Sequence, residues 1–214
     1  FTQDAVPADE HVVEELVKAF QDPRVGAAYG RQLADKDCRI IEKYTRSFNY
    51  PAESRIKSAE DLEELGIKTF FCSNVCAMYD RKVYEELGGF VTHTIFNEDM
   101  IYAAGLIEAG YSIAYAADAQ VYHSHNYGCI AQMKRNFDLG VSQAQYPEIF
   151  EKYPSEGEGI RMVRQDGCLC MQDPKTVAAG AAVFQSGFNI WLSSRKHYQR
   201  FHGSDQHCTM NRNW

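Results

Sequence analysis

Short apolar runs alternate with amphipathic stretches along this sequence, and no other feature constrains the fold as strongly. The apolar runs predict strands at residues 25–29, 67–72, 112–117 and 120–125. Apolar side chains at helical spacing predict helices at 12–20, 40–48, 98–109 and 129–142. Strands that alternate with helices are typical of an α/β domain with a largely parallel sheet.

Local signals mark several helix ends. Ser58-Ala59-Glu60-Asp61 predicts a helix cap, and Asp80 predicts a second one. Gly66 and Gly110 predict helix ends. The chain has 214 residues, which suffices for one core with a small appendage. We therefore expect one α/β domain over residues 1–150 and a helical tail over 151–214, with a disordered end.

Composition narrows the class of protein. Hydrophobic residues make up 45% of the chain, which is ordinary for a globular protein. The net charge of -7 argues against a nucleic-acid partner, because phosphate contacts need a basic face. We find no secretory signal and no apolar run of membrane-spanning length. Seven cysteines without zinc-finger or thioredoxin spacing favour reduced thiols in a cytosolic protein over a disulfide framework.

Two adjacent acids, Glu98 and Asp99, open the predicted helix at 98–109. Carboxylates at a helix N-terminus accept backbone N–H bonds and feel the helix dipole, so we expect their charged forms to be favoured. One interpretation is a simple helix cap. The other is a site edge, because Gly88-Gly89 and Phe96 describe a turn and a loop that deliver the acids there. A carboxylate so placed can take the proton of an attacking hydroxyl.

A pair of histidines, His123 and His125, ends the last predicted strand. Residues two apart on a strand point the same way, so both imidazoles could meet one ion, with Asp4 as a further ligand. A third His or Cys at zinc spacing is not obvious, which favours Mg²⁺ or Mn²⁺ bound together with phosphate and water. The alternative is a pair of exposed or hydrogen-bonded strand histidines.

Two further places could bind a ligand. Lys134 and Arg135, on the helix after the histidines, could neutralise a phosphate or hold an acceptor, or could simply form a solvated helix face. The segment Phe70-Phe71-Cys72-Ser73-Asn74 could stack on a sugar ring and hydrogen-bond it. A plain turn between strands explains that segment equally well.

The order of these motifs resembles that of family-two inverting glycosyltransferases, over residues 1 to about 150. The motifs are Thr2-Gln3-Asp4-Ala5-x-Pro7, Val25 to Gly30, Phe71 to Tyr79, Gly88-Gly89-Phe90, Asn97-Glu98-Asp99 and His123. The sequence is most similar to bacterial rhamnosyltransferases that build O-antigen or capsular polysaccharide. The resemblance implies a GT-A fold, which is a Rossmann-like mixed sheet that binds a nucleotide sugar.

The resemblance also implies roles for individual residues. Asp99 would be the catalytic base with Glu98 on the acceptor side. Asp4 would be the last acid of the metal-binding DxD motif, and His123, with His125 beside it, the late metal ligand. Gln132 and Arg135 resemble the Q-x-x-R element of processive relatives, which implies a cofactor-binding role. The implied cofactor is Mg²⁺ or Mn²⁺, and the implied donor is a nucleoside-diphosphate sugar like dTDP-rhamnose.

The sequence departs from the family pattern at its start. Thr2 stands where the first DxD acid is expected, so metal or ribose binding would differ. The family's N-terminal nucleotide-binding strands should precede Phe1, so we expect a partial GT-A domain. The basic and aromatic segment from Trp191 to Phe201 suggests contact with a membrane surface, where lipid-linked acceptors lie, or a helix packed on the domain.

Three functions follow as expectations. The first is inverting transfer of a sugar, rhamnose, to a saccharide or lipid-linked acceptor, in the cytoplasm and peripherally at the inner face of the membrane. The second is a non-catalytic carbohydrate-binding or interaction fragment. The third is a metallohydrolase that uses His123, His125 and a carboxylate.

Overall fold

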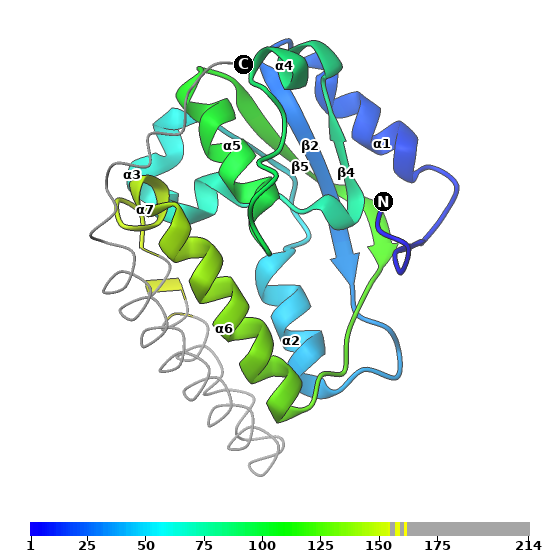
Figure 1. Cartoon of the computed structure of the whole chain (residues 1–214). Coiled ribbons are helices and arrows are strands. Elements are labelled where there is room, and N and C mark those ends of the chain that lie inside the picture. Colours follow the sequence, from blue (N-terminus) through cyan, green and yellow to red (C-terminus); the bar gives the residue numbers. More distant parts are fainter. Residues whose placement is uncertain (155–156, 159–160, 162–214) are drawn as a thin grey trace, which may run out of the picture. The chain divides into compact units, whose positions relative to one another are not determined.

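The structure is a computed structural model that describes residues 1–154, 157–158 and 161 (Figure 1). The chain divides into two compact units. The first unit comprises Phe1–Val91 and Glu98–Asn126, and the second comprises Thr92–Asn97 and the chain from Tyr127 onward. The predicted domain boundary near residue 150 stays a prediction. The predicted helical tail and its basic, aromatic segment lie almost entirely outside the described residues.

The first unit holds the sheet and most of the helices that the structure describes. Its strands are β1 (Val6–Pro7), β2 (Val25–Leu33), β3 (Arg55–Lys57), β4 (Ala77–Tyr79) and β5 (Ser112–Tyr122). Its α-helices are α1 (Val12–Lys18), α2 (Ile40–Asn49), α3 (Leu62–Leu65), α4 (Arg81–Glu86) and α5 (Glu98–Glu108). Short 3₁₀ turns cover Ala19–Gln21, Ala59–Asp61, Gly66–Phe70 and Asn74–Cys76. The second unit contains α6 (Cys129–Gln145) and α7 (Pro147–Phe150).

The strands form one mixed sheet in the order β1-β5-β2-β4, and β3 pairs with the start of β5 (Figure 1). Only the central pair of β2 and β5 is parallel among the described strands; β1, β3 and β4 all pair antiparallel with their neighbours. The expectation of a largely parallel sheet was therefore wrong, because periodicity identifies strands without giving their direction. The α/β class with a mixed sheet is confirmed, and it agrees with a partial GT-A fold.

The parallel pair contains a register shift that merges two predicted strands into one. Gly30 pairs with Ala116 and Arg31 pairs with Gln120, so β5 bulges over the three residues between them. A Cβ on Gly30 would lie 2.4 Å from the Ala119 carbonyl oxygen and 2.8 Å from the Cys76 sulfur. Glycine thus allows the bulge to approach β2, and β5 continues to Tyr122, where the histidines follow.

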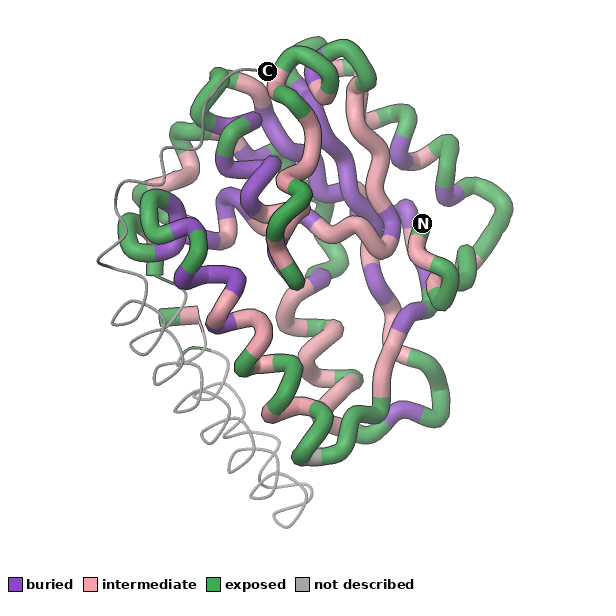
Figure 2. Tube along the Cα trace, viewed as in Figure 1, coloured by how far each residue is buried: buried purple, intermediate pink, exposed green. Residues whose placement is uncertain are grey.

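Adjacent residues of β2 point to opposite faces of the sheet, and each face has its own core. Val12 and Leu16 of α1 pack against Ala28 and neighbouring aliphatic side chains on one face. On the other face, Tyr29 contacts the rings of Phe71 and Tyr115. Figure 2 shows that the buried residues follow the central strands and α5. Val13 and Val17, which are apolar residues of the same helix, are exposed.

Two predicted helix caps are present, and one predicted strand is not. Ser58 and Asp61 form the predicted capping box, and the Asp80 side chain accepts from the first turn of α4. The strand predicted at 67–72 is wrong, because Gly66–Phe70 forms a 3₁₀ turn whose apolar side chains are buried. A short apolar run does not distinguish a buried strand from a buried turn.

The sequence also predicts reduced cysteines and no apolar run of membrane-spanning length. Cys38, Cys72 and Cys76 are buried free thiols, as expected for reduced cysteines. Burial raises the pKa of the Cys72 thiol to about 12. Among the residues that the structure describes, no helix is both long and apolar enough to cross a membrane.

Candidate active site

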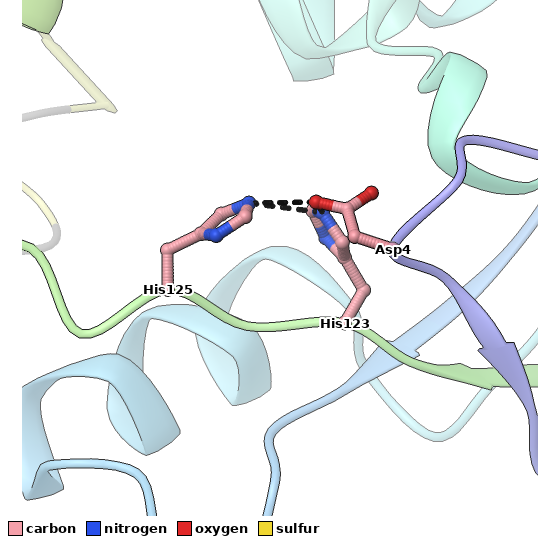
Figure 3. A group of neighbouring side chains, drawn as sticks. All are labelled: Asp4, His123 and His125. Atoms are coloured by element: carbon pink, nitrogen blue, oxygen red, sulfur yellow. Dashed lines mark hydrogen bonds and ion pairs between the residues drawn. The ribbon is translucent and has the colours of Figure 1, made fainter.

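Asp4, His123 and His125 meet in the first unit and are called the Asp–His cluster below (Figure 3). Their ligand atoms form a small triangle. The Nε2 atoms of the two histidines are 3.1 Å apart, and Oδ2 of Asp4 lies 3.3 Å from His123 Nε2 and 3.4 Å from His125 Nε2. The predicted grouping of these three residues is therefore present in the folded chain.

The triangle has the dimensions that a small divalent ion requires. Ligands at about 2.0–2.1 Å from an ion lie about 2.9 Å apart at right angles and about 3.3 Å apart at the tetrahedral angle. The measured sides of 3.1–3.4 Å fall near both values. Two imidazoles and one carboxylate on one side of an ion leave the other coordination positions open. The residues present thus fit an ion that also binds an external ligand.

The cluster joins the start of the chain to the end of β5. The Thr2 amide donates to the Val75 carbonyl, and β1 pairs with the last residues of β5, so Asp4 is held between two anchored points. The His123 amide donates to the Leu33 carbonyl at the end of β2. The Asp4 side chain is 52% exposed and the His123 side chain 9%, so the cluster is open to solvent on the Asp4 side. The Thr2 side chain, more than the histidines, lowers the pKa of Asp4.

His123 also has a buried polar neighbour behind its ring. Its Nδ1 lies 2.9 Å from Oε1 of Gln32, and that oxygen also accepts from Arg46. Burial, and then the positive charge of Arg46, lower the pKa of His123. The neutral form of this imidazole is therefore favoured, which is the form that binds metal ions.

The acid pair, Glu98 and Asp99, lies at the first turn of α5, as predicted. Asn74 holds both acids: its amide N–H donates to Asp99 Oδ2 at 3.1 Å, and its side-chain Nδ2 donates to Glu98 Oε1 at 3.0 Å. The Tyr79 hydroxyl donates to Asn74 Oδ1 at 2.6 Å, which fixes the orientation of that amide. Asn74 was considered as a sugar contact, but its side chain already has these two protein partners.

The charge state of Asp99 differs from the expectation. Its carboxylate accepts from the Asn74 and Met100 amides, which favour the charged form. Burial outweighs these bonds, and together with the nearby Glu98 it raises the pKa of Asp99 to about 6. The expectation that the helix terminus favours ionisation was therefore wrong for Asp99, because the sequence does not reveal how far a carboxylate is desolvated. A pKa near the working pH suits a general base.

The Asp–His cluster and the acid pair are connected through hydrogen bonds within the first unit. Nε2 of Gln32 donates to the Ser73 hydroxyl at 2.8 Å, and Ser73 is followed by Asn74, which binds both acids. Thr2, two residues before Asp4, bonds to Val75 in the same segment. The segment 73–75 therefore contacts the surroundings of both groups.

Gln132 and Arg135 lie on α6 in the second unit. The Gln132 side chain donates to Asn136 at 3.0 Å. The Arg135 guanidinium lies over the rings of Phe96 and Tyr127, 4.7 and 5.8 Å from their centroids. Their predicted role toward the donor stays a prediction.

Sequence reasoning missed Gln32 and Arg46, which lie on β2 and α2. Gln32 is 2% exposed, and a buried glutamine within an apolar strand is unusual enough to draw attention. Its partner His123 is 91 residues away, so no local pattern indicates the contact.

The mixed α/β fold, the Asp–His cluster and the partly buried Asp99 agree with the resemblance to glycosyltransferases. The family model for glycosyl transferase family group 2 matches residues 3–138 of the chain. The chain belongs to this family.

Two O-antigen chain rhamnosyltransferases are similar to this chain. The O-antigen chain rhamnosyltransferase RfbN of Salmonella typhimurium is 48% identical over 166 residues. The O-antigen chain rhamnosyltransferase WbaN of Salmonella anatum is 46% identical over 166 residues. Each match covers 77% of this chain and 53% of the relative. The chain thus spans about half the length of the curated relatives it matches.

Proposed function

We propose that this chain is the metal- and acceptor-binding part of an inverting glycosyltransferase that transfers rhamnose during surface-polysaccharide synthesis. The donor would be a nucleoside-diphosphate sugar like dTDP-rhamnose, and the acceptor a saccharide or a lipid-linked saccharide. Membership of the family and the names of the two relatives support this proposal. The observation that carries it is the Asp–His cluster in one unit with the partly buried Asp99, connected through Gln32, Ser73 and Asn74.

Asp99 is proposed as the general base. Its two oxygens are held by the Asn74 and Met100 amides, so the carboxylate has a fixed orientation. It would take the proton of an acceptor hydroxyl while that oxygen forms a bond to the anomeric carbon. The bond from the same carbon to the diphosphate breaks, and its electron pair leaves with the nucleoside diphosphate. Attack opposite the leaving group inverts the configuration, through a transition state with oxocarbenium character.

Glu98 is proposed to help orient the acceptor, since its carboxylate lies beside Asp99 and is held by Asn74. Asp4, His123 and His125 would hold Mg²⁺ or Mn²⁺. When bound, such an ion supplies positive charge for a diphosphate leaving group. Because three ligands are already present, an acid in place of Thr2 is not required to complete one face of the site. Gln132 and Arg135 are proposed as further donor contacts.

The location is proposed as cytoplasmic, with peripheral contact at the inner face of the membrane. The basic and aromatic segment from Trp191 to Phe201 supports the membrane contact through its composition alone. A lipid-linked acceptor would then be reached at the membrane surface.

Replacement of Asp99 in the full-length enzyme tests the proposed base. Asp99→Asn should abolish release of nucleoside diphosphate and formation of the rhamnosylated product, and should leave donor affinity by calorimetry unchanged. Glu108→Gln, at the exposed opposite end of α5, is the matched control and should keep full transfer. Near-normal turnover by Asp99→Asn would refute the assignment.

A titration separates the transferase from the non-catalytic alternative. Binding of a nucleoside diphosphate that depends on Mn²⁺ is expected for the transferase. Binding of saccharide without any metal-dependent nucleotide binding would favour a carbohydrate-binding fragment. Tightly bound zinc in the purified protein would instead favour a metallohydrolase.

A further inference from the structure

Gln32 has contacts at both ends of its side-chain amide, although it is almost completely buried. Its oxygen meets an Arg46 N–H and His123 Nδ1, and its nitrogen donates to the hydroxyls of Tyr50 and Ser73. Every atom of the amide that can form hydrogen bonds is therefore used. A buried polar group with this many partners specifies geometry more than it adds stability.

Arg46 decides which way this amide points. The hydroxyls of Tyr50 and Ser73 can either donate or accept, so they would tolerate a flipped amide. A guanidinium can only donate, so the atom that it meets must be the Gln32 oxygen. Arg46 itself is held by Glu42, whose Oε1 accepts from Arg46 Nη2 at 2.8 Å and from the His125 amide at 3.3 Å. The orientation is thus fixed from helix α2.

The fixed amide in turn decides the tautomer of His123. An oxygen 2.9 Å from Nδ1 must accept, so Nδ1 carries the proton in the neutral ring. Nε2 is then left with a lone pair, and Nε2 is the atom that faces Asp4 at 3.3 Å. A histidine binds a metal ion through the nitrogen that lacks the proton, and the partner of the other nitrogen sets which one that is.

We infer that Gln32 and Arg46 are positioning residues that fix His123 in the Nδ1–H tautomer, so that Nε2 is presented to the Asp–His cluster as a ligand. The inference rests on the proposed function only for its purpose, which is to prepare a metal ligand. In the metal-free chain the ring faces two acceptors, the buried Gln32 oxygen at Nδ1 and the Asp4 carboxylate at Nε2. The Asp4 side chain is 52% exposed and can be solvated by water instead, so the single proton of the neutral ring stays with Gln32. Neither Gln32 nor Arg46 touches the reacting groups.

Nitrogen-15 NMR of the histidine rings in the metal-free chain, at about pH 8 where neutral imidazole prevails, tests the tautomer directly. Wild-type His123 should show a protonated Nδ1 and an unprotonated Nε2. Arg46→Met, which keeps the apolar stem but removes the donors, should lose this single tautomer because the Gln32 amide is free to flip. Arg46→Lys, which retains a donor, should largely restore it.

Manganese affinity supplies the second measurement, read from the electron paramagnetic resonance signal of free Mn²⁺. Arg46→Met should weaken binding by about 10–100-fold, as is typical when the partner of a ligating histidine is lost. Lys43→Met removes a positive charge from the same helix at an exposed position and should leave both measurements unchanged. Gln32→Met, which removes the acceptor, should behave like Arg46→Met and replaces it if that variant does not fold.

These measurements distinguish failure of the inference from failure of the proposed metal site. A wild-type His123 protonated on Nε2 overturns the inference without any variant. So does a folded Arg46→Met or Gln32→Met protein that keeps both the Nδ1–H tautomer and the wild-type affinity. A wild-type chain with the expected tautomer that binds no Mn²⁺ would leave the inference standing and refute the proposed metal site instead.

Discussion

Replacing Asp99 by Asn should change how the stability of the chain depends on pH. Burial raises the pKa of Asp99 from its ordinary value of 3.8 to about 6. Between these values the folded state keeps a proton that the unfolded state has released. Stability falls as pH rises wherever the folded state binds more protons. The carboxylate should therefore cost nothing below pH 3.8 and its full penalty above pH 6.

The size of the penalty follows from the same two values. A rise from 3.8 to about 6 corresponds to about 3 kcal/mol. The side chain is partly exposed, so solvent screening reduces this to about 1–3 kcal/mol. Asparagine has one oxygen where aspartate has two, so Asp99→Asn also loses one of two N–H bonds, at about 1 kcal/mol at every pH. The variant should be less stable than wild type at pH 4 and gain about 1–3 kcal/mol relative to it by pH 7.

Urea unfolding of both proteins at several pH values between 4 and 8 measures this difference. Asp99→Ser provides the control, because any side chain that does not titrate must remove the same pH dependence even if its stability differs. Free-energy curves for wild type and Asp99→Asn that stay parallel across this range would refute the desolvation of Asp99.

Three further outcomes are expected. Gly30→Ala should lower the free energy of unfolding by about 1–3 kcal/mol, because its Cβ would lie 2.4 Å from a carbonyl oxygen of β5; unchanged urea unfolding would contradict this contact. Burial lowers the pKa of Lys57 to about 7, so the unfolded state binds more protons between pH 7 and 10.5 and stability should rise over that window. Lys57→Met should remove the rise, and a rise that persists in the variant would rule out Lys57 as its source. Mn²⁺ at about 100 times its dissociation constant should stabilise the chain by about 2.7 kcal/mol in thermal unfolding, and chelation or Asp4→Asn should abolish the gain; an equal shift in Asp4→Asn would place the ion elsewhere.

The fold could be predicted from the sequence wherever the signal is local. The capping box at Ser58 and the helix that begins at Glu98 depend on neighbouring residues, and both are present. Strand direction depends on contacts between distant segments, and a periodic pattern does not reveal those contacts. The predicted sheet was therefore more parallel than the observed one. The bulge opposite Gly30 was read as a break between two strands, because sequence periodicity does not show that pairing resumes after a shift.

The candidate site follows the same division. Strand geometry and a family resemblance both predicted that Asp4, His123 and His125 lie together. The three residues do meet in the structure. The pKa of Asp99 and the contact from Gln32 to His123 could not be foreseen. Each depends on what surrounds a side chain after folding, and that information is spread over several elements.

Ser73 and Asn74 are consecutive residues, and each serves a different group: Ser73 accepts from Gln32, and Asn74 holds the acids. A backbone displacement of this dipeptide would disturb the geometry of the Asp–His cluster and the pKa of Asp99 at once. Variants that tune one property without the other should therefore arise at more distant positions, and natural variation at this dipeptide should be tolerated only when both properties survive.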